Sequence, residues 1–67
     1  MSREEFEQLT EGDLVISPPY ASEGRVIRKA VLRGCSYINI AWPDGQQGTI
    51  VVDSWQREKL VKVGRGE

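Results

Sequence analysis

Alternation of inward and outward side chains over residues 35–42, CSYINIAW, restricts the fold of this chain more than any other feature. Successive side chains of a β-strand point to opposite faces, so Ile38, Ile40 and Trp42 share one apolar face. The sequence Pro-Asp-Gly-Gln follows at residues 43–46 and predicts a turn, because proline presets φ and glycine accepts a positive φ. The pattern therefore predicts a β-hairpin with Trp42 facing inward, where we expect it to fill the core beside the turn.

Short runs rich in β-branched residues predict four more strands. They lie at residues 13–17, 25–32, 49–52 and 59–63. The run at residues 25–32, RVIRKAVL, alternates imperfectly because apolar pairs occupy positions 26–27 and 31–32. A β-bulge near Lys29 and Ala30 would let both pairs contribute to the core.

Helix signals are confined to two short segments. Ser2 and Glu5 have the spacing of a capping box, which predicts an N-terminal helix of about two turns. Phe6 and Leu9 share one face of that helix and would lean on the rest of the domain. A single helical turn is expected at residues 53–56, capped by Asp53 or Ser54.

Five strands this short are too small for a two-sheet sandwich in a chain of 67 residues. Closing them into a small barrel buries one face and removes most open edges. We therefore expect a mostly β fold: a five-stranded barrel with a short N-terminal helix and a helical turn before the last strand. The expected division is a helical arm over residues 1–11, the barrel over residues 12–63 and a disordered tail over residues 64–67.

This layout resembles the SH3-like small β-barrels over residues 12–63. The matching segments are GDLV at residues 12–15, EGRV at residues 23–26, and the turn at residues 53–57 followed by LVKV at residues 60–63. The spacing Gly-Asp-x-Val and then Gly-x-Val is similar to that of KOW-type ribosomal and transcription-factor modules. It is also similar to that of the small photosystem barrel subunit that docks ferredoxin. Such likeness implies a fold more than a function.

A more distant likeness is to the plasmid-encoded type II dihydrofolate reductases, which are SH3-like barrels that work as tetramers around a central pore. Their pore signature on the late strand is Val-Gln-Ile-Tyr. Here the late strand reads TIVVD over residues 49–53, so the glutamine and tyrosine of the pore are absent.

The composition argues against catalysis and against a metal site. Histidine is absent, which removes the commonest general base and the commonest zinc ligand. Cys35 is the only cysteine, so no intrachain disulfide and no cysteine-rich metal site can form, and a half-buried strand position is its expected fate. We expect no catalytic residues, no cofactor and no enzyme activity. The lack of a disulfide framework, of a long apolar run and of a secretory signal predicts a cytoplasmic protein without membrane contact.

Three aromatic residues are candidates for a contact surface: Tyr20, Tyr37 and Trp55. Tyr37 is out of phase with the inward face of its strand. The resemblance implies that Tyr20 and Trp55 lie together, since the long first loop and the pre-terminal turn form the ligand groove of SH3-like barrels. Exposed aromatic rings stack on bases or grip extended peptides. Alternatively, Trp55 covers an open end of the barrel or packs on Phe6.

Basic residues would form the rim of this surface, namely Arg25, Arg28 and Lys29. Even spacing puts Arg25, Lys29 and Arg33 on one face of a regular strand, with Arg28 opposite unless a bulge intervenes. Such a patch suits phosphate or acidic groups. It is equally consistent with a solvated strand edge protected by charge.

The charge distribution is uneven: residues 1–24 carry a net charge of −5 and residues 25–67 carry +4. An acidic front and a basic body suggest two different surfaces. We expect a non-catalytic binding or adaptor module that contacts a protein partner. Two alternatives remain open, a KOW-like module that binds nucleic acid or the ribosome, and an oligomeric pore enzyme of the reductase type. The oligomeric state is not predicted.

Overall fold

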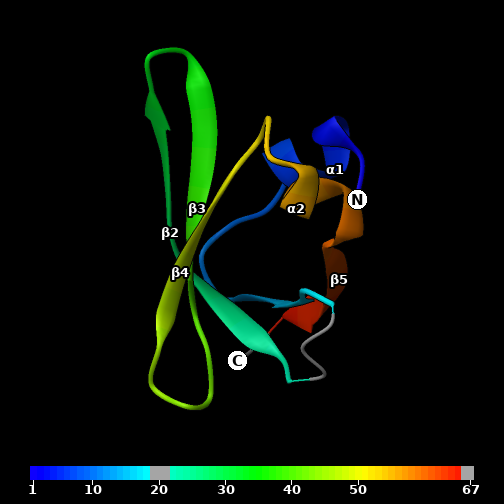
Figure 1. The fold of residues 1–67 in the computed structure, drawn as a ribbon, viewed down its shortest axis with the longest axis vertical. Coiled ribbons are helices and arrows are strands. Elements are labelled where there is room, and N and C mark those ends of the chain that lie inside the picture. Colours follow the sequence, from blue (N-terminus) through cyan, green and yellow to red (C-terminus); the bar gives the residue numbers. More distant parts are fainter. Residues whose placement is uncertain (19–21, 66–67) are drawn as a thin grey trace.

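In the computed structural model, residues 1–18 and 22–65 are described and form five antiparallel strands and two short helices (Figure 1). In chain order, the elements are α1 (Arg3–Glu7), β1 (Asp13–Ile16), β2 (Gly24–Leu32), β3 (Cys35–Ala41), β4 (Gln47–Val51), α2 (Trp55–Lys59) and β5 (Val61–Arg65). The predicted fold class is confirmed: the protein is mostly β, with a short N-terminal helix and a small helix before the last strand.

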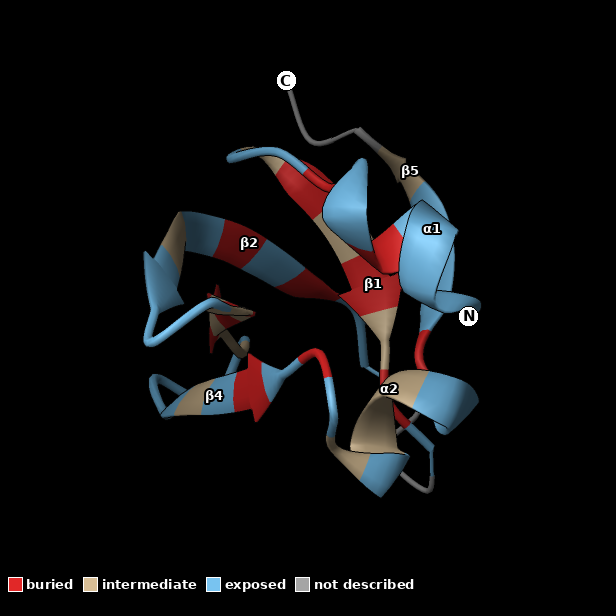
Figure 2. Cartoon of the chain, turned by 90° about the horizontal axis from the view of Figure 1, so that it is seen from above, coloured by how far each residue is buried: buried red, intermediate tan, exposed pale blue. Residues whose placement is uncertain are grey.

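The strands form one strongly curled sheet in the order β4-β3-β2-β1-β5 (Figure 2). Among the described residues, β4 and β5 are the two ends of this order and do not pair with each other. The sheet is therefore a half-barrel, and the expectation of a closed cylinder was wrong. The N-terminal segment and the segment after α2 cover the open side instead, because Phe6, Leu9 and Leu60 insert into the core.

The core occupies the concave side of the sheet. It consists of Phe6, Leu9, Val15, Val26, Ile38, Ile40, Ile50, Val52 and Leu60. Burial along β3 alternates with a period of two, which confirms the predicted inward phase of Ile38 and Ile40. Trp42 follows in the same phase, and its partly buried side chain packs against the core beside the turn, as expected.

The bulge in β2 lies nearer the start of the strand than predicted. The register between β2 and β3 shifts between Val26 and Arg28, so that Ile27 is the extra residue. Val26 is fully buried, whereas Val31 and Leu32 are 66% and 65% exposed. The expectation that both apolar pairs reach the core was therefore wrong. In Figure 1 the tip of the β2–β3 hairpin projects past the body of the protein, so no core lies beside it.

Both helices begin at predicted capping residues. The amide of Glu5 donates to Ser2 Oγ at 3.1 Å, and the amide of Ser2 donates to Glu5 Oε1 at 3.2 Å, which completes the capping box. The second of these bonds is the main reason why the pKa of Glu5 is lowered. Ser54 caps α2 through the amide of Gln56 at 3.2 Å.

Contacts between distant parts of the chain hold α2 in place. The Arg57 guanidinium donates to the carbonyls of Val52 at 2.5 Å and Met1 at 3.0 Å. The Met1 ammonium group in turn donates to the carbonyl of Leu60 at 2.7 Å. Strand β5 continues through Gly64 and pairs as far as Arg65, two positions that the sequence predicted to belong to a disordered tail.

Candidate binding surface

The outward side of β2, β3 and β4 faces away from the helices. Cross-strand partners lie on the same side of a sheet, so the register assigns each side chain to a face. Arg28 lies opposite Asn39, and Tyr37 lies opposite Val51. These residues alternate with the buried ones and therefore point outward. We call this surface the convex face, and its larger side chains are Arg25, Arg28, Leu32, Tyr37, Thr49 and Val51.

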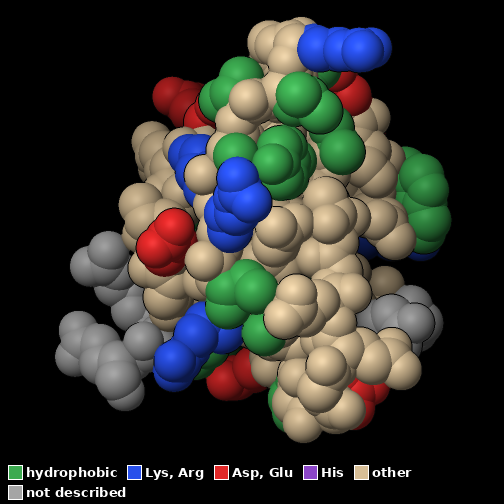
Figure 3. All heavy atoms as spheres, turned by 90° about the vertical axis from the view of Figure 1, so that its left-hand side faces the viewer, with side chains coloured by type: hydrophobic (Ala, Val, Ile, Leu, Met, Phe, Trp, Pro, Cys, Tyr) green, Lys and Arg blue, Asp and Glu red, His purple; other side chains and the backbone are tan. Residues whose placement is uncertain are grey.

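The convex face combines exposed apolar groups with basic groups. Leu32 is 65% exposed and Val51 is 40% exposed, while Tyr37 is half-buried. Figure 3 views this side of the molecule and shows hydrophobic side chains interspersed with Lys or Arg side chains. Thr49 donates from Oγ1 to Asn39 Oδ1 at 2.8 Å, which makes a polar link between β4 and β3.

The three strands beneath the convex face contain no aspartate or glutamate. Residues 24–32, 35–41 and 47–51 hold Arg25, Arg28 and Lys29 and no acidic residue, although the whole chain has more acidic than basic residues. The net charge of these three strands is therefore positive, opposite in sign to that of the whole chain. An anionic partner would approach this side in preference to the acidic N-terminal segment.

At the border of the face, Asp53 follows β4 and is engaged by two side chains. The Cys35 thiol donates to Asp53 Oδ2 at 3.5 Å, and Arg3 lies 3.6 Å from Asp53 Oδ1. The hydrogen bond to Asp53, with a further contribution from burial, raises the pKa of the Cys35 thiol. A raised pKa leaves little thiolate at neutral pH, so this arrangement opposes a nucleophilic role for Cys35.

The structure brings together three of the six predicted site residues. Arg25, Arg28 and Tyr37 all lie on the convex face, because the bulge at Ile27 moves Arg28 to the side of Arg25. The same shift turns Lys29 to the opposite side, where its ammonium group donates to the carbonyl of Glu7. The expectation that Arg25 and Lys29 share a face was therefore wrong.

The predicted pairing of Tyr20 with Trp55 is not supported by the described residues. Tyr20 lies outside them. Trp55 belongs to α2, on the side of the sheet that the helices cover (Figure 1), and is 64% exposed. Its ring has Lys59 Nζ at 5.5 Å from the centroid, a cation–π contact within the helix. Neither alternative that the sequence left open for Trp55, packing on Phe6 or covering a barrel end, fits this exposure.

Leu32 and Val51 are members of the convex face that sequence reasoning did not identify. Leu32 was expected in the core as part of an apolar pair, and Val51 was predicted to lie on a strand without being assigned to a face. The position of Leu32 directly before the Arg33-Gly34 turn was the available signal, because residues at a hairpin tip extend past the neighbouring strands.

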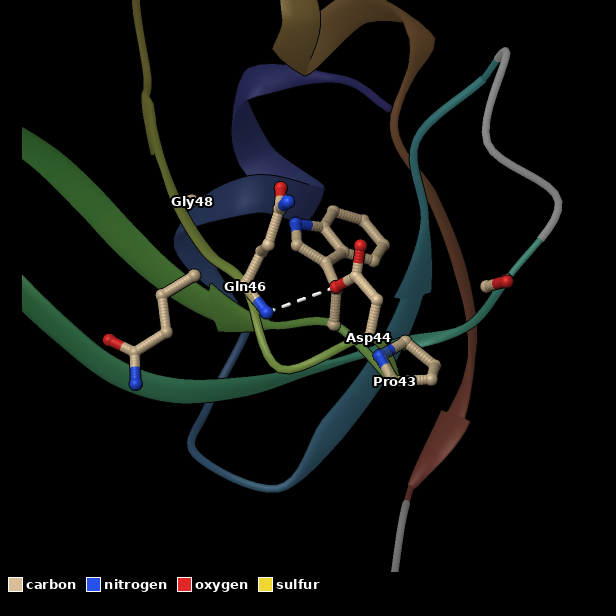
Figure 4. A pocket seen from close by; sticks show the side chains of 7 residues that line it. Pro43, Asp44, Gln46 and Gly48 are labelled. Carbon is tan, nitrogen blue, oxygen red and sulfur yellow. Dashed lines mark hydrogen bonds between the residues drawn. The ribbon is translucent and has the colours of Figure 1, made fainter.

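A separate cavity of about 310 Å³ lies at the turn between β3 and β4 (Figure 4). Its described lining consists of Ser22, Trp42, Pro43, Asp44, Gln46, Gln47 and Gly48. Asp44 Oδ1 accepts the amide of Gln46 at 3.0 Å, which fixes the turn. The indole and the glutamine carboxamides offer stacking and hydrogen bonds to a small polar group, and they hold no acid–base pair.

Residues 1–18 and 22–65 contain neither a metal-binding cluster nor a membrane-spanning helix. No three of the cysteine, aspartate or glutamate side chains in these residues gather as a group that could hold a metal ion. Within the same residues, no helix has the length and hydropathy to cross a membrane. Comparison with known proteins finds no match to a family model, to a curated protein or to a solved structure.

Proposed function

We propose that this protein is a non-catalytic binding module that holds an acidic segment of a protein partner on its convex face. One observation carries the proposal: exposed aliphatic side chains and the half-buried Tyr37 share one face with Arg25 and Arg28, on three strands without a single acidic residue. Arginine and tyrosine are enriched where proteins bind one another, and exposed apolar groups supply area to bury.

The proposal includes membership of the SH3-like small barrels. The strand order β4-β3-β2-β1-β5, with α2 between β4 and β5, supports that assignment. The contact surface proposed here differs from the loop groove that the resemblance implied, because Trp55 and the convex face lie on different sides of the sheet.

A second candidate is a KOW-like module that binds nucleic acid. The basic residues of β2, β3 and β4, and the absence of acidic residues from these three strands, favour it, since arginine binds phosphate and Tyr37 could stack on a base. The exposed aliphatic residues Leu32 and Val51 favour the protein partner instead, because aliphatic side chains provide no stacking platform.

The deciding experiment is selection from a displayed peptide library, followed by affinity measurement on the enriched peptides. We expect peptides in which Asp or Glu flanks an aliphatic or aromatic residue. Arg28→Ala should weaken them about tenfold, which corresponds to about 1.4 kcal/mol. Tyr37→Ala should weaken them as well. Trp55→Ala is the matched control, since it removes an exposed aromatic ring on the other side of the sheet, and it should leave affinity unchanged.

Two outcomes would contradict the protein-binding proposal. One is enrichment of peptides whose affinity falls with Trp55→Ala and not with Arg28→Ala. The other is tight binding of a single-stranded oligonucleotide with a log–log salt slope of about −2, as expected when about three phosphates are neutralised. The second result would establish the nucleic-acid candidate.

A further inference from the structure

The free edge of β4 lacks the features that usually protect an exposed strand. Edge strands expose unpaired backbone groups, and proteins blunt them with charged residues, proline or bulges. The other edge strand, β5, carries Lys62 and pairs with β1 through a register shift. Strand β4 reads QGTIV, without charge or proline, and its register with β3 is continuous.

The hydrogen-bond phase determines which groups of β4 point to the free edge. The amide of Trp42 donates to the carbonyl of Gln46, and the amide of Val52 donates to that of Ser36. Bonded pairs alternate with non-bonded pairs in an antiparallel ladder. In this register the residues of β4 at positions 48 and 50 bond to β3, so those at positions 47, 49 and 51 direct their backbone groups outward.

These outward groups are available among the described residues, with one exception. The carbonyl of Val51 accepts the amide of Ser54 at 2.9 Å. The amides of Gln47, Thr49 and Val51 and the carbonyls of Gln47 and Thr49 have no backbone partner within residues 1–18 and 22–65. They form a short, regular row of donors and acceptors.

We propose that a second copy of this chain pairs with β4 through its own β4, antiparallel and about a two-fold axis at Thr49. In that register, Thr49 of each copy exchanges both backbone bonds with its counterpart, and the amide of Val51 donates to the carbonyl of Gln47 in the other copy. The closest side-chain pairs on the convex face are then Thr49 with Thr49, and Gln47 with Val51.

The absence of charged side chains from β4 makes a second copy of this strand a suitable occupant of the free edge. No charged side chain lies on β4, so the two-fold axis brings no like charges into opposition. Cross-strand threonine pairs are favourable, and a two-fold arrangement closes after two copies. The convex faces of the two copies then form one continuous surface, which goes beyond the binding function proposed for a single chain.

The interface is small, and the dimer is accordingly weak. One pairing of five-residue strands buries less area than a stable interface requires. We expect a monomer–dimer equilibrium that light scattering coupled to size exclusion detects between about 1 µM and about 1 mM chain.

Two substitutions of Thr49 test the register and keep every backbone hydrogen bond between β4 and β3, although both remove the side-chain hydrogen bond to Asn39. Thr49→Lys sets two like charges opposite each other at the axis and should abolish the dimer. Thr49→Pro removes an amide that points outward, which edge strands tolerate, and should abolish it too. Val63→Lys adds the same charge to the other edge strand, where Val63 is 45% exposed, and should leave the dimer intact.

Amide hydrogen exchange provides a second readout in the unmodified chain. Protection of Thr49 and Val51 should rise with concentration, whereas Ile50 should be protected at every concentration because it bonds to β3. A chain that stays monomeric across the whole range overturns the proposal. So does a dimer that survives both substitutions of Thr49. Neither result bears on peptide binding by Arg28 and Tyr37, which is measured separately.

Discussion

The indole of Trp42 packs directly on the backbone of Gly24. A Cβ atom built on Gly24 would lie 2.6 Å from Trp42 Cζ3 and 2.4 Å from Ile40 Cγ2. Both distances are far below van der Waals contact, so glycine at this position allows the first residue of β2 to approach the turn between β3 and β4. The close approach seats the indole at one end of the core.

Gly24→Ala should therefore destabilise the protein by about 1–3 kcal/mol, the usual cost of overpacking a filled site. Urea denaturation measures the change as a lower midpoint at an unchanged m-value. Gly64→Ala is the control, because a Cβ atom there meets nothing within 4 Å. A Gly24→Ala midpoint no lower than that of Gly64→Ala would show that the indole does not pack in this way.

The two tryptophans should differ sharply in their contribution to stability. Trp42 packs against the core, whereas Trp55 is 64% exposed and contacts Lys59 of its own helix. We expect Trp42→Ala to lower the free energy of unfolding by about 2 kcal/mol or more. Trp55→Ala should change it by no more than about 0.5 kcal/mol. Denaturation of the two variants side by side checks the order, and equal losses would be inconsistent with the structure.

Strand phase was predictable from the sequence wherever apolar residues alternate singly. Ile38, Ile40 and Trp42 are separated by one residue each, so only one face could be buried. The capping box of Ser2 and Glu5 was equally readable, because both of its bonds depend on a local spacing of three residues.

The bulge and the open sheet were not predictable in the same way. Adjacent apolar pairs at residues 26–27 and 31–32 fit several bulge positions, and only the extent of the core decides among them. The hairpin tip lies past that core, which leaves Val31 and Leu32 in solvent. Closure of the sheet depends on whether β4 and β5 meet, and that is a long-range outcome to which Phe6, Leu9 and Leu60 contribute by covering the open side.

The candidate surface was half predictable for the same reason. Tyr37 was placed correctly by its phase in a regular strand. Arg28 and Lys29 exchanged faces because their side depends on the bulge, and the pairing inferred for Trp55 came from a resemblance and not from local chemistry.

Asp13 is buried and should be more important for stability than the lysine beside it. Its carboxylate accepts the amide of Thr10 at 2.9 Å, and Lys62 Nζ lies 3.8 Å away. Asp13→Ala removes the acceptor of a partly buried amide, so we expect a loss of about 1–3 kcal/mol. Lys62→Met removes only a half-exposed partner at long range and should cost less than about 1 kcal/mol. Thermal or urea unfolding of both variants measures the two losses of stability. A larger loss for Lys62→Met than for Asp13→Ala would contradict this ranking.

The reactivity of Cys35 should respond in opposite directions to its two charged neighbours. Its pKa is raised by the hydrogen bond to Asp53, and the nearby Arg3 acts in the lowering direction. Asp53→Asn should therefore lower the thiol pKa and speed alkylation by iodoacetamide at a fixed pH near neutrality, because the thiolate is the reacting species. Arg3→Ala should raise the pKa further and slow the reaction, since it leaves the charge of Asp53 unopposed.

The measurement is the rate of alkylation as a function of pH for the parent chain and both variants. The three profiles should have the same shape and be displaced along the pH axis, with Asp53→Asn at the lowest pH and Arg3→Ala at the highest. Displacement of both variants in one direction would indicate that the substitutions act by opening the strand end and exposing the thiol. In that case the hydrogen bond between Cys35 and Asp53 would not be what controls the thiol.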